Sequence, residues 1–469
     1  MYNFHKVIVV LTLSLYSWQA PANQQNVLPF SKAIKQAQKV DPWLKGNVYQ
    51  QQATESLSEV ALALPDPKVS IGIANLATDS FDFNQEAMSQ LKVGISQMFP
   101  RGDSREIKNR QLMIESEKFP FQRQNRQAQV AVTVGSLWLD GYLIEQTIAL
   151  IDRNYSLFSQ LVELANNRYA STSGRGNQQD VVRAELELSK VEEKLEGFYQ
   201  QKNNNYGLLL QWLNASNISQ PFSFGEHLPT IELAEKIKLK QDNWSLEQAA
   251  TAHFLEHPAV LALDKKIQST AISIQLAKQK YQSQWGINAS YAYRDDDPMG
   301  NNRADLLSVG ITFDLPLFTE NKQDKQVKAT ISQTEAVKTD KQLLLRKMLS
   351  NYASTAGRLA RLFARKSLYR DKLLPQYQLQ SAVTLNAYTN DRGDFNEVIR
   401  ANIAEQDAQI KYLALLVEEQ KLSLALNYLF VNSYKNQYSA LGATTKHKNK
   451  NIEVTHHQGT DHEGISHEY

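Results

Sequence analysis

The sequence predicts an α+β membrane protein built from two copies of one unit, each with a pair of β-strands and a hairpin of long α-helices. Two stretches in which apolar and polar residues alternate end at Pro100 and Pro316, 216 residues apart. Such alternation is typical of a strand with one apolar face. A long stretch with helical apolar spacing follows each of them. An internal repeat of this kind determines the architecture before local detail does.

Composition narrows the class of protein. The 469 residues carry a net charge of +2, which gives no reason to expect a nucleic-acid partner. Mean hydropathy is −0.45, and no apolar run approaches the ~20 residues of a membrane-spanning helix. The chain has no cysteine, so we expect no disulfide, no thiolate metal site and no lipid anchor on an N-terminal cysteine. We also expect no cofactor.

Residues 1–22 are predicted to be a secretory signal peptide. Lys6 precedes the apolar stretch Val7–Leu15, and Ala20-Pro-Ala22 provides a small-residue cleavage site. Because cleavage after Ala20 would place a proline next to the cut, we expect cleavage after Ala22. The mature chain is then exported.

The first repeat is expected over 23–213 and begins with a helical region that Asp41-Pro42 interrupts, since a proline disfavours helical backbone in the residue before it. Its strands are predicted at about 68–75 and 91–99. A helix from about 104 to 170, kinked at Pro120, and a returning helix form the hairpin. Their coiled-coil seam is predicted to comprise Ile144, Ile148, Ile151, Tyr155, Phe158, Val162, Ala165 and Tyr169, with Val181, Ala184, Leu188, Val191, Leu195 and Phe198.

The second repeat is expected over 244–430, after a connector at 214–243. It contains a strand pair at about 286–293 and 307–315. A long helix over about 321–388, a turn at Thr389–Gly393 and a returning helix to about Phe430 form its hairpin. Residues 431–469 are a polar, histidine-rich tail.

Each predicted strand has about ten residues, the length of a tilted strand that crosses a bilayer. One chain offers four strands, whereas known transmembrane barrels begin at eight. An open sheet in lipid would leave unpaired backbone groups, so the barrel must be shared between chains. The alternative is a soluble sandwich with half-buried strands, which does not explain the flanking coiled-coil helices.

The most specific pattern lies at the turns between the long helices. Tyr388-Thr-Asn-Asp-Arg-Gly393 precedes Glu397-Val-Ile-Arg-Ala401, and Tyr169…Gly174 precedes Asp180-Val-Val-Arg-Ala184. With the duplicated strands and hairpins, these residues make the chain resemble the TolC-like outer-membrane factor family, the exit ducts of tripartite efflux and type I secretion systems. The resemblance implies a homotrimer with a twelve-stranded β-barrel in the outer-membrane lipid and a periplasmic α-barrel of helices. A periplasmic adaptor and an inner-membrane pump of the resistance-nodulation-division type are the implied partners.

The resemblance also implies site residues near these turns. Tyr388 and Asp180 correspond to a gate contact between hairpins, and Arg392 lies one place from the gate arginine. Glu397 corresponds to one position of an acidic ring at the entrance, whereas Arg400 departs from that pattern and weakens the expected cation preference. The alternatives are purely structural: packing at a helix end for Tyr388 and a position on a solvated helix face for Glu397. The hairpin tips implied for adaptor docking contain Gly174, Gly176 and Gly393.

Two features favour heavy-metal cations as the substrate. Five of the nine histidines lie in the tail, and four of them are candidate metal ligands: His456, His457, His462 and His467. Histidine-rich tracts often bind Zn, Cu or Ni, although a polar terminus without ligands is the alternative. Leu64-Pro-Asp-Pro67 and Asn75…Ser80 are similar to the metal-efflux branch of the family.

An enzyme is not expected. His253-Phe-Leu-Glu-His257 fits a zinc-protease pattern, but Pro258 disfavours helical backbone at the second histidine. Arg101-Gly-Asp103 is interpreted as a strand-to-helix turn. The resemblance implies a passive outer-membrane exit channel. Drug efflux and type I secretion are the alternatives within this class, and a soluble periplasmic coiled-coil scaffold or adaptor is the alternative from another class.

Overall fold

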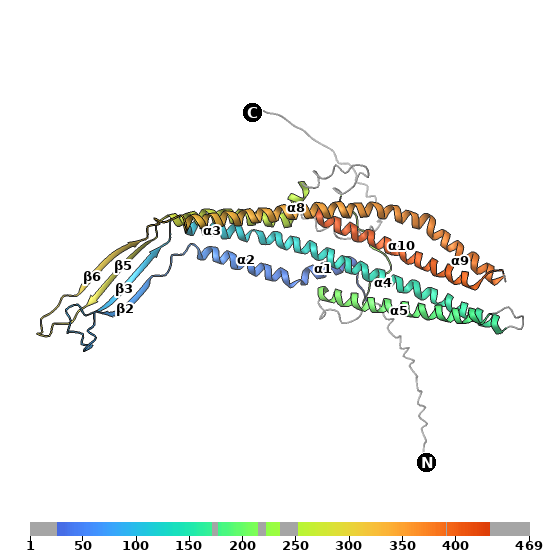
Figure 1. Cartoon of the computed structure of the whole chain (residues 1–469), viewed down its shortest axis with the longest axis horizontal. Helices are drawn as coiled ribbons and strands as arrows, with labels where there is room; N and C mark the ends of the chain where they lie inside the picture. Colours follow the sequence, from blue (N-terminus) through green and yellow to red (C-terminus); the bar gives the residue numbers. More distant parts are fainter. Residues whose placement is uncertain (1–25, 171–176, 214–221, 235–251, 391, 432–469) are drawn as a thin grey trace, which may run out of the picture.

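The computed structural model describes residues 26–170, 177–213, 222–234, 252–390 and 392–431. A small sheet lies at one end, and long helices run away from it in one curved layer (Figure 1). The predicted signal peptide, parts of the connector and almost all of the tail lie outside the described residues. No described helix is both long and apolar enough to cross a membrane.

The sheet contains four strands in the order β2-β3-β5-β6, and all neighbours are antiparallel. They are β2 (Lys68–Ala74), β3 (Gln90–Phe99), β5 (Trp285–Tyr293) and β6 (Leu306–Phe313). The prediction of four strands is confirmed. β6 ends two residues earlier than expected, at Phe313. The side chain of the next residue, Asp314, accepts a hydrogen bond from the Gln284 backbone N–H at 2.6 Å and pairs with Arg101.

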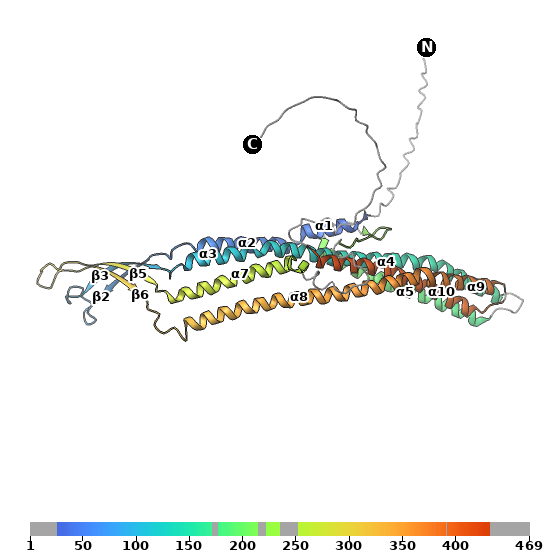
Figure 2. The ribbon, with the colours of Figure 1, turned by 90° about the horizontal axis from the view of Figure 1, so that it is seen from above.

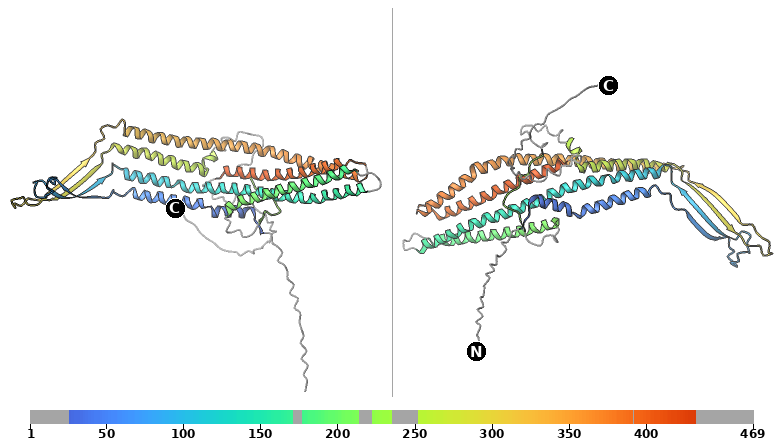
Figure 3. Two further views of the ribbon diagram at one scale, coloured as in Figure 1. Left: turned by 60° about the horizontal axis from the view of Figure 1, so that its bottom comes forward. Right: turned by 180° about the vertical axis from the view of Figure 1, so that it is seen from behind.

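The helices next to the sheet follow the order of the strands, as Figure 2 shows. They are α2 (Pro42–Val60), α3 (Ser104–Ser116), α7 (Pro258–Lys278) and α8 (Gln323–Leu368). At the far end, α4 and α10 lie in the middle of the layer, and α5 and α9 lie at its two edges (Figure 3). These helices are α4 (Lys118–Ala170), α5 (Gln178–Leu213), α9 (Leu374–Thr389) and α10 (Phe395–Leu429). The duplicated element order is therefore visible in the structure.

Each interruption of a helix has a proline as its cause. α1 (Phe30–Val40) and α2 are separate because Asp41 has non-helical backbone before Pro42 and caps α2 from its side chain. α3 and α4 separate at Glu117, three residues before Pro120, where the proline ring lacks an N–H for the carbonyl of Ser116. The π-helical turn η4 (Tyr369–Leu373) similarly precedes Pro375. The kink expected at Pro120 is thus a break.

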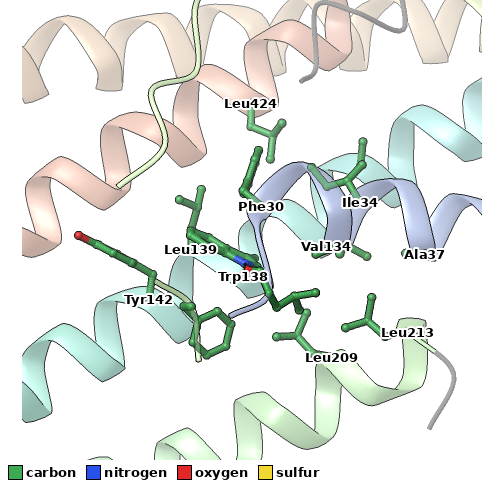
Figure 4. Packing of buried hydrophobic residues seen from close by; sticks show 14 of the residues in the cluster. Phe30, Ile34, Ala37, Val134, Trp138, Leu139, Tyr142, Leu209, Leu213 and Leu424 are labelled. Carbon is green, nitrogen blue, oxygen red and sulfur yellow. Dashed lines mark hydrogen bonds between the residues drawn. The ribbon is translucent and has the colours of Figure 1, made fainter. Parts of the chain in front are cut away.

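A buried aromatic cluster fixes α1 against α4 halfway along the layer (Figure 4). The Trp138 ring stacks on Tyr142 at 5.8 Å and meets Phe30 and Phe224 edge to face at 5.4 and 5.7 Å. Its indole N–H donates to the carbonyl of Leu28 at 2.7 Å. Beside this cluster, β1 (Asn26–Val27) pairs in parallel with β4 (Phe222–Ser223), so segments about 200 residues apart meet at the middle of the layer.

Candidate functional site

The two hairpins meet in a hydrophobic cluster near their turns, here called the tip cluster. Its buried members are Ile151, Phe158, Leu161, Ala165, Ala184, Val191, Tyr388, Phe395, Val398 and Ile399. Most of the predicted seam positions of the first hairpin lie in it or pack against it. Tyr169 does not: it is 54% exposed, so the seam ends at Ala165. The prediction for Tyr169 was wrong because its side chain lies on the exposed side of the last turn of α4, whereas its neighbour Arg168 contacts the other hairpin.

Tyr388 lies inside the tip cluster with 4% of its surface exposed. Its ring meets Phe395 at 5.3 Å, and the guanidinium of Arg168 lies over it at 4.0 Å from the ring centre. Arg168 also donates to the Tyr388 carbonyl at 2.7 Å. A cation over an aromatic face and a charge-assisted hydrogen bond both stabilise such a contact. Arg168 of the first hairpin therefore holds the end of α9 in the second.

Asp180 lies at the start of α5, close to the same arginine. Burial and the neighbouring carboxylate of Asp394 raise the pKa of Asp180, whereas Arg168 and Arg183 act in the opposite direction. Arg183 in turn donates to the side-chain carbonyl of Asn396. Asp180 and Tyr388 are thus connected through Arg168. Polar groups from both hairpins meet at this end of the molecule.

The remaining predicted residues near the second turn lie on the surface. Glu397 and Arg400 form an exposed ion pair at 3.5 Å, one helical turn apart on α10. Arg392 is exposed, and its backbone N–H donates to the carbonyl of Ala387 at 2.9 Å. A Cβ atom at Gly393 would lie 2.8 Å from the backbone nitrogen of Tyr388, so this tight turn requires glycine. Gly174 and Gly176 lie outside the described residues.

Sequence reasoning missed Arg168 and Phe395, the two residues that enclose the Tyr388 ring. Phe395 follows the predicted turn directly and could have been found as the first apolar residue of the returning helix. For Arg168 the only signal was its position next to Tyr169. Nothing in the sequence pattern indicates that it reaches the other hairpin, 220 residues away.

The sheet has one apolar face and one small, polar face. The register aligns Val69, Ile95, Ala289 and Val309 in one rung, and Ser70, Gly94, Ser290 and Ser308 in the next. Large apolar side chains from all four strands are exposed, among them Val69, Ile95 and Val309. Aromatic residues mark both ends of this face: Phe99, Trp285 and Phe313 share the rung near the helices, and Tyr291 and Tyr293 lie near the loops. One face of the sheet is thus apolar with aromatic residues at both ends, and the other face is small and polar.

Metal ligands are not assembled in the described part of the chain. No group of three or more His, Asp or Glu side chains there is arranged to hold an ion. The zinc-protease pattern does not form a metal site either. His257 has extended backbone, accepts a hydrogen bond from the Ala259 N–H at 3.2 Å and donates one to the Tyr428 carbonyl at 3.1 Å. Both ring nitrogens are thus occupied. His456, His457, His462 and His467 lie outside the described residues.

Comparison with known proteins identifies the fold. No protein-family model and no curated protein matches the sequence. The structure is similar to CusC, solved in work on folding and transmembrane channel formation, with a TM-score of 0.69 and 12% identity over 88% of this chain and 92% of CusC. It is also similar to the outer membrane protein VceC of Vibrio cholerae (TM-score 0.67, 14% identity, 87% and 97% covered). The open state of the MtrE outer membrane channel of Neisseria gonorrhoeae gives 0.66 and 11%, with 86% and 88% covered. The chain therefore has the fold of outer-membrane channels.

Proposed function

We propose that this protein is the outer-membrane exit channel of a tripartite efflux system and conducts its substrate passively. The observation that carries the proposal is the sheet, whose exposed apolar side chains from four strands lie in register on one face. A soluble scaffold has no use for such a face, because water-exposed apolar surface of this extent is unfavourable. In lipid, the same face is stabilised.

Closure of the barrel requires further copies. β2 and β6 lie at the two edges of the sheet and run antiparallel to one another, so β6 of one copy can pair with β2 of the next. Three copies then give twelve strands. The helices follow the order of the strands and would continue the barrel as a periplasmic tube. Solved structures with the same fold belong to a protein that forms a transmembrane channel and to an outer-membrane channel, which supports a pore in the outer membrane.

The far end of the tube is the proposed gate and entrance. Asp180, Tyr388, Arg392, Glu397 and Arg400 all lie near the hairpin turns, and the turns are the proposed docking points for the periplasmic adaptor. The pair between Glu397 and Arg400 supports a weaker cation preference at the entrance than two acidic residues would give. An inner-membrane pump of the resistance-nodulation-division type would deliver the substrate.

Heavy-metal cations are the proposed substrate. The support comes from the sequence alone, from the histidine-rich tail and from the pattern at 64–80. Drug efflux and type I secretion use the same architecture and stay open as alternatives. Loss of zinc, copper or nickel tolerance on deletion of the gene, with unchanged drug tolerance, would distinguish metal export from these two alternatives.

Channel function itself is tested by fractionation and conductance. The mature protein should be recovered in the outer membrane, resist extraction with salt or alkali, and form ion channels in planar bilayers. Recovery in the soluble periplasmic fraction would support the scaffold alternative and contradict the proposal. A test variant removes the apolar face by replacing four of its side chains with serine: Val69, Ile71, Val309 and Ile311. This variant should lose membrane association.

A further inference from the structure

The loop between β6 and α8, at the junction of sheet and helices (Figure 1), exposes three large apolar side chains. Leu315, Leu317 and Phe318 have exposed fractions of 61%, 72% and 90%. Single exposed apolar side chains are common on protein surfaces, whereas a contiguous group of them indicates an interaction surface. Within the described part of the chain, no other element covers these three side chains.

The corresponding loop of the first repeat, residues 100–103, is built differently. It contains no large apolar side chain. Its Arg101 donates to the Gln282 carbonyl at 2.8 Å and pairs with Asp314, so polar contacts hold this loop against the neighbouring segments. The apolar group is therefore a feature of the second loop and not a consequence of the repeat.

Leu315 continues the apolar face of the sheet. The Asp314 N–H donates to the Gln284 carbonyl at 3.3 Å, so backbone pairing with the segment before β5 extends one residue past the end of β6. Side chains alternate between the two faces of a strand. Leu315 therefore emerges on the face that carries the exposed side chains of Ile311 and Phe313.

A tight turn centred on Pro316 follows directly. The Leu317 N–H donates to the Leu315 carbonyl at 2.9 Å, which is the hydrogen bond of a three-residue turn. Proline suits the centre of such a turn, because its ring fixes φ close to the value of an inverse γ-turn. The chain therefore leaves the strand direction after Leu315, and Leu317 and Phe318 follow the bend.

The loop lies just beyond the rung of Phe99, Trp285 and Phe313. In the proposed orientation, this aromatic rung marks the periplasmic interface of the membrane. Leu315 is two residues further, which is about 7 Å along the strand and about 5 Å along the membrane normal at a tilt of ~40°. The headgroup region is about 5–8 Å thick on each side of the hydrocarbon. The loop thus lies at headgroup depth.

We propose that Leu315, Leu317 and Phe318 insert into the periplasmic leaflet of the outer membrane and anchor each chain at that interface. The anchor rests on the proposed channel function and extends the lipid contact beyond the strands. Leu317 and Phe318 are consecutive, and both are mostly exposed. Lipid headgroups can surround a loop on several sides, whereas a second protein surface covers one side. Aromatic and aliphatic side chains at headgroup depth are typical of interfacial anchors.

Site-specific fluorescence tests the anchor, because the natural chain has no cysteine and one introduced thiol can be labelled alone. Phe318→Cys carries a polarity-sensitive dye, and the assembled protein is reconstituted into phosphatidylcholine vesicles with or without a lipid that is spin-labelled at its headgroup. The emission should shift to shorter wavelength on reconstitution and be quenched by the spin label. Gln342→Cys is the matched control: it is also exposed, but it lies about 28 Å beyond the start of α8 and should respond to neither.

A reference position separates the anchor from the proposed function. Ile311→Cys, on the apolar face of the sheet, should be quenched by a lipid that is spin-labelled in its acyl chain. Quenching at Ile311→Cys but not at Phe318→Cys, with the second dye accessible to aqueous iodide, overturns the anchor and leaves the channel proposal standing. Absence of quenching at both positions overturns both proposals.

Contact with a neighbouring copy has its own signature. A dye at Phe318→Cys that is shielded from the spin-labelled lipid and from iodide identifies protein as the cover of the loop, which also overturns the anchor. If the labelled Phe318→Cys variant does not assemble, Leu317→Cys carries the same test, with the same expected shift and quenching.

Discussion

An arginine placed at the middle of the apolar face should destabilise the membrane-inserted chain far more than the same arginine on the other face. Val309 shares a rung with Ala289, four residues from both the Trp285 and the Tyr293 rungs. These aromatic rungs are eight residues apart, which is about 26 Å along the strand and about 20 Å along the membrane normal at a tilt of ~40°. Val309 therefore lies at mid-depth in the proposed bilayer.

Lysine or arginine at the midplane of a barrel costs about 2–4 kcal/mol, and the cost falls to about 0–1 kcal/mol near the interfaces. Val309→Arg should thus lower the folding equilibrium per chain roughly 30- to 700-fold. Ile311→Arg, which lies nearer to the Trp285 rung, should cost less. Ser308→Arg should cost little, because its neighbours across the rung, Ser290, Gly94 and Ser70, are small.

The assay is equilibrium folding into phospholipid vesicles as a function of urea concentration, followed by tryptophan fluorescence. Val309→Arg should shift the midpoint most, Ile311→Arg less and Ser308→Arg least. Equal shifts for Val309→Arg and Ser308→Arg would refute the assignment of one face to lipid. A larger shift for Ser308→Arg would show that the faces are reversed.

The remaining predictions concern pH, the tip and the tail. Burial lowers the pKa of His257 to about 4 from 6.5. The unfolded chain therefore binds more protons than the folded chain between these pH values. The free energy of unfolding of the helical part should fall by about 2 kcal/mol as pH drops from 7 to 5, and the fall should be complete below about pH 4. Denaturant titrations should show this slope, and His257→Asn, which can still cap α7, should remove it. Arg168→Met should raise closed-state conductance because Tyr388 loses a cation and a hydrogen bond. The control Arg153→Met, at an exposed position of the same helix, should leave the conductance unchanged. Equal conductance in both variants would mean that Arg168 only packs. Tyr388→Phe combined with Asp180→Ala should also admit large antibiotics more freely, and unchanged admission would contradict a gate role. Deleting residues 446–469 should leave conductance intact and lower metal tolerance modestly; absence of Zn or Cu binding to the tail peptide in calorimetry would contradict a metal role for the tail.

The strands were predictable because alternation of apolar and polar residues depends only on neighbours along the chain. The register between the strands was not predictable in this way, although the repeat helped to place the strand pairs. The two halves meet between β3 and β5, and this pairing brings Val93 beside Tyr291, 198 positions later. Proline positions likewise predicted the interruption at Asp41 and a kink at Pro120, where the structure instead has a break at Glu117. The π-helical turn before Pro375 was missed because the sequence shows a proline but not how a long helix absorbs it.

The tip shows where sequence reasoning stops. Tyr169 and Tyr388 occupy similar places before the two turns, yet the first is exposed and the second is buried. The difference depends on Arg168 and Phe395, which come from different hairpins and enclose only one of the two rings. Such a contact is set by how the hairpins pack against one another, and no local spacing encodes it.

The most direct test of the proposed channel is the mass of the protein extracted from the outer membrane in mild detergent, measured by light scattering with the detergent contribution subtracted. Four strands per chain cannot close a barrel in lipid, so the protein mass should be close to three times that of one mature chain. Boiling in denaturing detergent should then reduce it to a single chain. A stable monomer that still conducts ions in a planar bilayer would contradict the shared barrel.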